Sequence, residues 1–188
     1  MNDHHLIFGE LIDCITGETL ADTHDERYRQ KIAHLLIGQK GYPTDELIPR
    51  YPLTVRAGEK CARVPVTLLA RANRKTAMLI QYGPGSLTTR HRPALAMSRL
   101  VEPYQIPVVV VTNGEQADIL DGMSGERTAT GFSELPTYDQ LVKLAATGPW
   151  LPIDAKRADM EARIVFAFEV DDRCPCDDTV CQLVPVHK

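Results

Sequence analysis

The stretch ARVPVTLLARANRKTAMLIQYGPGSL, residues 62–87, decides the fold. Its first run, 62–71, is rich in β-branched residues, and its second, 76–82, is almost wholly apolar, as buried strands are. The polar residues 71–75 between the two runs predict a hairpin turn. Together with the run YPLTVRAG at 51–58, the stretch predicts a meander of three strands.

A helix is expected before this meander, in ETLADTHDERYRQKIAHLLIGQKGY, residues 18–42. Asp22 or Thr23 can cap its start, and Gly41 follows its last turn. An apolar stripe would pack this helix against the sheet. The stripe consists of Tyr28, Ile32, Leu35 and Leu36.

The sequence after the meander alternates helix and strand signals. Thr88 or Thr89 is expected to cap a helix that runs to about Glu102, with Pro93 in its first turn. A buried strand at 106–114, a hairpin within 116–131, and helices near 138–146 and 154–162 follow. This order predicts a mixed α/β central sheet flanked by helices, in a domain at 1–150 with an accessory segment, 151–188, packed on it.

Composition indicates one ordinary globular domain. The chain has 188 residues, 44% hydrophobic and 24% charged, which is enough for a sizeable core. Its start, MNDHHLIFGELIDC, is too polar for a secretory signal, and apolar runs such as 108–111 are too short to span a membrane. We therefore expect a soluble, cytoplasmic protein without membrane contact.

Positive charge is concentrated in the middle of the chain. Residues 50–99 hold ten basic residues and one acid, so they carry +9 of a net charge of −4 and leave −13 for the remainder. Such asymmetry points to a phosphate-rich partner such as DNA or RNA. The alternative is that these side chains scatter over a solvated surface.

Three pieces, taken in order, resemble the amino-terminal nuclease domain of type I restriction enzyme R subunits, a branch of the PD-(D/E)XK superfamily. They are ERYRQKIAHLLIGQKGYPTDELIPRYPLTV, ARVPVTLL and PVVVVTNG. The resemblance covers roughly residues 8 to 147 and implies a restriction-endonuclease-like fold. Active members of the family have an Asp on the second core strand and Glu-x-Lys on the third. The two carboxylates hold Mg²⁺, and the lysine stabilises the charge that develops during cleavage.

The resemblance assigns these catalytic positions to Pro65, Gln81 and Gly83. Proline and glycine have no side-chain oxygen, and a neutral amide is at best a minor Mg²⁺ ligand. We therefore expect no catalytic residue, no cofactor and a degenerate nuclease. An active enzyme would need relocated Mg²⁺ ligands. The nearest substitutes are Glu46, Glu59 and Lys75.

The stretch YGPGSLTTRHRP, residues 82–93, suits an anion better than a metal. Glycines allow close backbone approach, and a helix start presents unpaired N–H groups. The candidate phosphate-binding residues are Gly83, Gly85, Ser86, Thr88, Arg90, His91, Arg92 and Arg99. In the competing interpretation the glycines only make a turn and the cations are solvated.

The carboxyl-terminal tail holds three thiols within eight residues: Cys174, Cys176 and Cys181. His187, Cys14 or Cys61 could supply a fourth zinc ligand. Free thiols are the default interpretation, since structural zinc sites usually use Cys-x₂₋₄-Cys spacing, only one such cluster exists here, and a disulfide framework is not expected.

Our leading hypothesis is a domain that binds nucleic acid or another phosphate-bearing ligand without cleaving it. The alternatives are a protein-interaction module, which would have a protein partner or form a homo-oligomer, and an active nuclease with relocated ligands.

Overall fold

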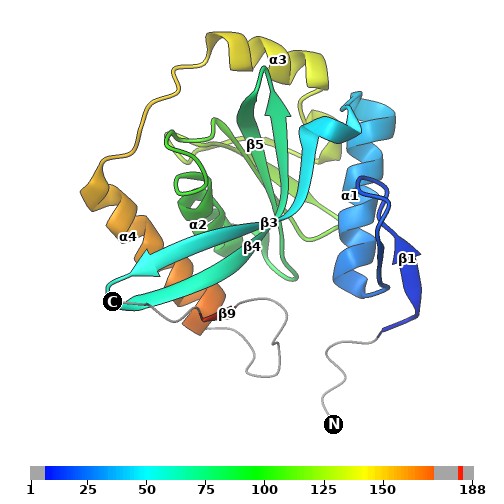
Figure 1. Ribbon diagram of the computed structural model, residues 1–188. Helices are drawn as coiled ribbons and strands as arrows, with labels where there is room; N and C mark the ends of the chain where they lie inside the picture. Colours follow the sequence, from blue (N-terminus) through cyan, green and yellow to red (C-terminus); the bar gives the residue numbers. More distant parts are fainter. Residues whose placement is uncertain (1–6, 172–181, 184–188) are drawn as a thin grey trace.

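A mixed β-sheet forms the centre of the protein, for which the computed structural model describes residues 7–171 and 182–183 (Figure 1). In spatial order its strands are β3 (Leu47–Ala57), β4 (Lys60–Ala72), β5 (Lys75–Tyr82), β6 (Val108–Thr112), β7 (Ala117–Asp121) and β8 (Arg127–Thr130). β5 and β6 run parallel, and the other neighbours on this path are antiparallel. β9 (Gln182–Leu183) pairs with β4 off this path, and β1 (Glu10–Ile12) and β2 (Thr19–Ala21) form a separate hairpin.

Helices cover both faces of the sheet. They are α1 (His24–Lys40), α2 (Leu87–Ser98), α3 (Tyr138–Thr147) and α4 (Ala155–Val165), with short helical turns at η1 (Thr44–Glu46), η2 (Phe132–Glu134) and η3 (Phe166–Asp171). One apolar core joins the sheet to α1 and α3, and the other joins it to α2 and α4. The α/β fold with a central mixed sheet and flanking helices is therefore confirmed.

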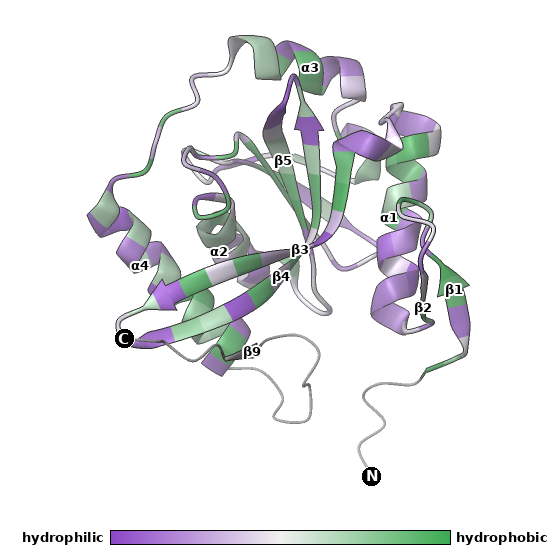
Figure 2. Ribbon diagram, in the orientation of Figure 1, coloured by the Kyte–Doolittle hydropathy of each residue, from purple (hydrophilic) through white to green (hydrophobic). Residues whose placement is uncertain are grey.

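The ends of α1 follow the sequence signals. The Thr23 hydroxyl accepts a hydrogen bond from the Glu26 N–H at 3.2 Å. Gly41 ends the helix with φ +75°, and its N–H bonds to Leu36 O. Figure 2 shows α1 as mostly hydrophilic over its first turns and more apolar later, where Ile32 and Leu36 enter the core.

The hairpin turn predicted at 71–75 is also present. Asn73 and Arg74 both have positive φ, 53° and 62°, and connect the paired residues Ala72 and Lys75. Two consecutive residues of this kind fit the twist of a tight hairpin. β3 and β4 are longer than expected, and Arg50, with φ +52°, interrupts the extended backbone of β3.

The prediction for α2 was wrong in two respects. Ser86, not Thr88 or Thr89, is its N-cap, and the helix ends at Ser98. Pro93 consequently lies in the second turn, where it is buried. The helix begins earlier because Gly85, at φ +89°, completes the turn and Leu87 already packs into the core. No helix in the described ranges is long and apolar enough to cross a membrane.

Candidate functional site

The three positions that the resemblance assigns to catalysis lie where β4 and β5 separate. The last paired residues of the two strands are Leu68 and Ile80, so Gln81 is the first residue beyond the ladder. Its Nε2 lies 3.5 Å from the carbonyl oxygen of Pro65, which it approaches as a donor. The Gly83 N–H donates to Thr112 O at 3.0 Å, which ties this edge to the end of β6.

The amide of Gln81 joins the two strands where their backbone pairing stops. Its Oε1 accepts from the Thr67 N–H at 3.1 Å and from the Thr67 hydroxyl at 3.4 Å. The same hydroxyl accepts from the Tyr82 N–H at 3.0 Å. The oxygen that a metal would need is therefore engaged in hydrogen bonds, and a carboxylate at this position could not donate to Pro65.

Arg90 reaches from α2 to the backbone of Gly83. A Cβ built on Gly83 would lie 3.1 Å from Arg90 Nε, so the guanidinium passes over the position where the resemblance places a lysine. Arg90 Nη1 is 4.0 Å from Oε1 of Glu169, on η3 after α4. Burial raises the pKa of the Glu169 carboxyl, and the charge of Arg90 opposes that shift. The Arg90 side chain remains 33% exposed, so the cation is still accessible to a ligand.

The loop before α2 contains the uncharged members of the candidate site. Gly85, Ser86 and Thr88 lie on this loop and on the first helical turn, and all three are exposed. Ser86 makes no side-chain capping bond. The Asn113 side-chain amide donates to Gly85 O at 3.2 Å and fixes the loop against the turn after β6.

His91 points toward β7 and not toward Arg90. Its Nε2 lies 2.8 Å from Oδ2 of Asp118, a residue that is 3% exposed. The other carboxylate oxygen of Asp118, Oδ1, accepts from the Thr130 hydroxyl at 3.0 Å. Arg127 approaches Asp118 to 3.5 Å. Burial tends to raise the pKa of Asp118, but the bonds from His91 and Thr130 and the charge of Arg127 outweigh it and lower that pKa.

Arg92 and Arg99 both turn toward Glu161 on α4. Their distances to its carboxylate are 2.5 and 2.8 Å, and Arg157 lies 3.6 Å away. Glu161 is 1% exposed and Arg99 4% exposed. The predicted set of cations is thus divided into an accessible Arg90, a His91 bonded to the sheet, and a pair that connects α2 with α4.

Three of the other basic residues of segment 50–99, Arg50, Lys60 and Arg71, also have acidic partners. Arg50 contacts Asp13, Glu18 and Glu26. Lys60 lies 3.5 Å from Asp171. Among the described residues, three arginines of this segment have no carboxylate within 4 Å. They are Arg56, Arg63 and Arg74.

The residues considered as relocated Mg²⁺ ligands or as a substitute amine are occupied or distant. Glu46 pairs with Arg71 at 3.4 Å, and Lys75, at the opposite end of β5 from Gln81, lies 4.3 Å above the Trp150 ring. Glu59 lies in the turn between β3 and β4. Within 7–171 and 182–183, no three His, Cys, Asp or Glu side chains gather as a metal would require.

The zinc alternative concerns residues that are mostly outside the described ranges. Cys174, Cys176, Cys181 and His187 all lie outside them, so that alternative stays a prediction. Cys61 is buried at 4% exposure and Cys14 is half-buried, both as free thiols.

Sequence reasoning named the cations of α2 but missed their acidic partners. Glu161, Glu169 and Asp118 lie on later elements and belong to no motif. Their only signal was the acidic excess outside residues 50–99.

The fold and the edge at Gln81 and Gly83 define a restriction-endonuclease-like α/β domain. A family model described as the type I restriction enzyme R protein N terminus matches residues 24–136, and the chain belongs to this family. No curated protein matches the chain, and no solved structure does.

Proposed function

We propose that this chain is a non-cleaving member of its family that binds nucleic acid or another phosphate-bearing ligand. The observation that carries the proposal is the position of Arg90 over Gly83. A cation from α2 lies where the resemblance places the lysine, whereas the two carboxylate positions hold Pro65 and Gln81. Such a site keeps an attraction for phosphate and lacks the carboxylates that would hold Mg²⁺.

Other features support the same function. Gly85, Ser86 and Thr88 are exposed beside Arg90. Farther away, Arg56 and Arg63 project from the β3–β4 hairpin, where Arg56 pairs with Cys61 and is thus a diagonal neighbour of Arg63. His91, Arg92 and Arg99 act in this proposal by holding α2 in place, because their side chains already have protein partners.

Binding of labelled single- and double-stranded DNA and RNA, with Mg²⁺ present, tests the proposal. We expect affinity that falls with salt, and nucleic acid that is recovered intact. Arg90→Gln should weaken binding and reduce the salt slope by about 1, as loss of one phosphate contact does. Lys143→Gln is the matched control, because Lys143 is exposed on α3, at the far end of β5. Cleavage, or no binding at low salt, would refute the proposal.

A protein-interaction module is the second candidate, and the inward-facing cations favour it. Arg92 and Arg99 are neutralised by Glu161, which removes two charges from any phosphate-binding surface. If nucleic acid fails to bind at low salt, this candidate takes precedence, and a partner protein or a second copy of the chain becomes the ligand to seek.

A further inference from the structure

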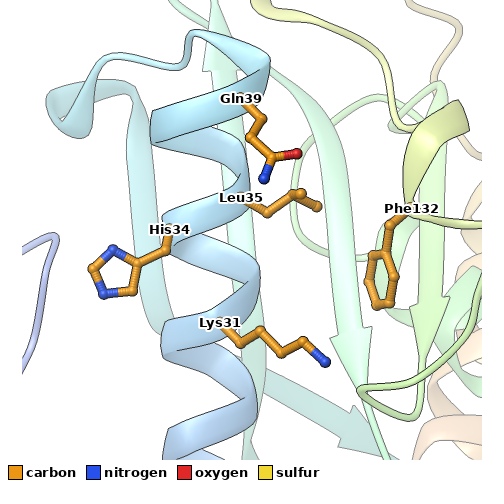
Figure 3. Close-up of a pocket in the computed structure, with 5 residues that line it drawn as sticks. All are labelled: Lys31, His34, Leu35, Gln39 and Phe132. Carbon is orange, nitrogen blue, oxygen red and sulfur yellow. The ribbon is translucent and has the colours of Figure 1, made fainter.

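A groove lies on the other face of the sheet, between α1 and η2 (Figure 3). Its volume is about 380 Å³. Lys31, Leu35 and Gln39 are spaced four residues apart on α1 and point toward Phe132, while His34 points away. The groove therefore has two apolar walls, Leu35 and Phe132, with a cation toward one end and an amide toward the other.

Both walls are held by the surrounding structure. Leu35 and Phe132 are partly buried and pack against the core of α1 and α3. The Gly131 N–H, directly before Phe132, donates to Ala117 O at 2.7 Å. On the other side, Lys40 Nζ donates to Ser133 O at 2.6 Å. The ring of Phe132 is thus anchored to α1 and β7 by the backbone on each side of it.

The cationic end of the groove adjoins the edge that holds Gly83. Lys31 Nζ donates one hydrogen bond, 3.0 Å long, to Gly114 O, which leaves two of its three donors. Gly114 lies in the turn after β6 and touches the ring of Tyr28, which in turn stacks on Tyr82 at 5.3 Å. The groove and the candidate site are therefore connected through neighbouring residues.

We propose that this groove receives one unstacked base of a single-stranded nucleic acid. The proposal rests on the function proposed above and specifies its ligand. A base would stack on the Phe132 ring with Leu35 opposite it, and Gln39 can offer both a donor and an acceptor to the base edge. Lys31 would contact the neighbouring phosphate. Bases within a duplex are stacked and paired, so the groove favours single strands.

The test compares a short oligothymidylate with an abasic oligonucleotide of the same length. Stacking on an aromatic ring predicts about tenfold tighter binding of the oligothymidylate. Phe132→Leu, which keeps an apolar wall, should remove most of this difference and leave the abasic affinity unchanged. Phe168→Leu is the control, because Phe168 is exposed at 41% and lies on η3. Comparing the two ligands on the unaltered protein makes the test independent of how the variants fold.

The outcomes separate this inference from the function on which it rests. Equal affinity for the two oligonucleotides would overturn the base site, whereas salt-dependent binding of both would still support the proposed function. Loss of the thymidylate preference in Phe168→Leu but not in Phe132→Leu would also overturn the base site. No binding of either oligonucleotide would overturn both proposals, and the groove would then suit an apolar side chain of a protein partner.

Discussion

The ion cluster around Glu161 gives the sharpest test of the structure. Replacing Glu161 by Gln removes one negative charge and keeps the size of the side chain. Arg99 is 4% exposed and would remain buried without its carboxylate. Breaking a buried ion pair on one side costs about 3–5 kcal/mol, and we expect the lower end because the amide oxygen still accepts one hydrogen bond.

Thermal unfolding measures this loss. For a protein of this length, about 3 kcal/mol corresponds to a fall in Tm of roughly 6–12 °C. Glu126→Gln is the control, because Glu126 is exposed and its change should stay within about 0.5 kcal/mol. Replacing both buried partners, Arg99→Met with Glu161→Leu, should lie closer to the original stability, since no unpaired charge is then left in the core.

Equal Tm values for Glu161→Gln and Glu126→Gln would refute this reasoning. Arg92 and Arg99 would then make no stabilising contact with α4, and both would again be candidates for binding phosphate. The effect of Glu161 on the stability of the protein thus shows whether Arg92 and Arg99 hold α2 against α4 or are available to bind phosphate.

Three further predictions concern separate sites. In the folded protein the pKa of Asp13 is lowered, because hydrogen bonds from neighbouring backbone N–H groups and from Arg50 outweigh the effect of burial. Its contribution is therefore present above the unfolded pKa and is lost as pH falls through the lowered folded pKa, so in urea titrations Asp13→Asn should be destabilising at pH 7 and progressively less destabilising as the pH is lowered below the ordinary range of an aspartate. Gly114→Ala should lower Tm, because the added Cβ would lie 2.1 Å from the Tyr28 ring at φ +88°, and an unchanged Tm would contradict that contact. Introducing the family's residues at two of the three positions that the resemblance assigns to catalysis, Gln81→Glu with Gly83→Lys, should not produce Mg²⁺-dependent cutting of DNA, since the second carboxylate, at position 65, is still missing, and any cutting that EDTA abolishes would disprove this expectation.

The sequence predicted the framework because its signals are local. The Thr23 cap, the Gly41 stop and the hairpin at 71–75 each depend on a few adjacent residues, and all appear in the structure. The start of α2 was missed by two or three residues, because three hydroxyl residues compete for the cap and Leu87 settles the choice by packing into the core.

The arrangement of the candidate site could not be predicted in the same way. Which arginine remains accessible depends on carboxylates that are distant in the sequence. Glu161 lies 69 residues beyond Arg92 and approaches it only when α4 packs on α2. The bonds of Gln81 to Thr67 likewise require the register of two strands, although the resemblance had already drawn attention to Gln81.

Several of the acids that pair with basic residues of the family region lie outside the span that matches the family. Asp13 and Glu18, which contact Arg50, precede residue 24, and Glu161 and Glu169 follow residue 136. A fragment trimmed to residues 24–136 would therefore expose several uncompensated arginines on an otherwise family-like core. It would also lose α4, which covers part of that core. Such a fragment should adhere to polyanions whatever the intact protein binds, so family boundaries are a poor guide for dissecting this chain.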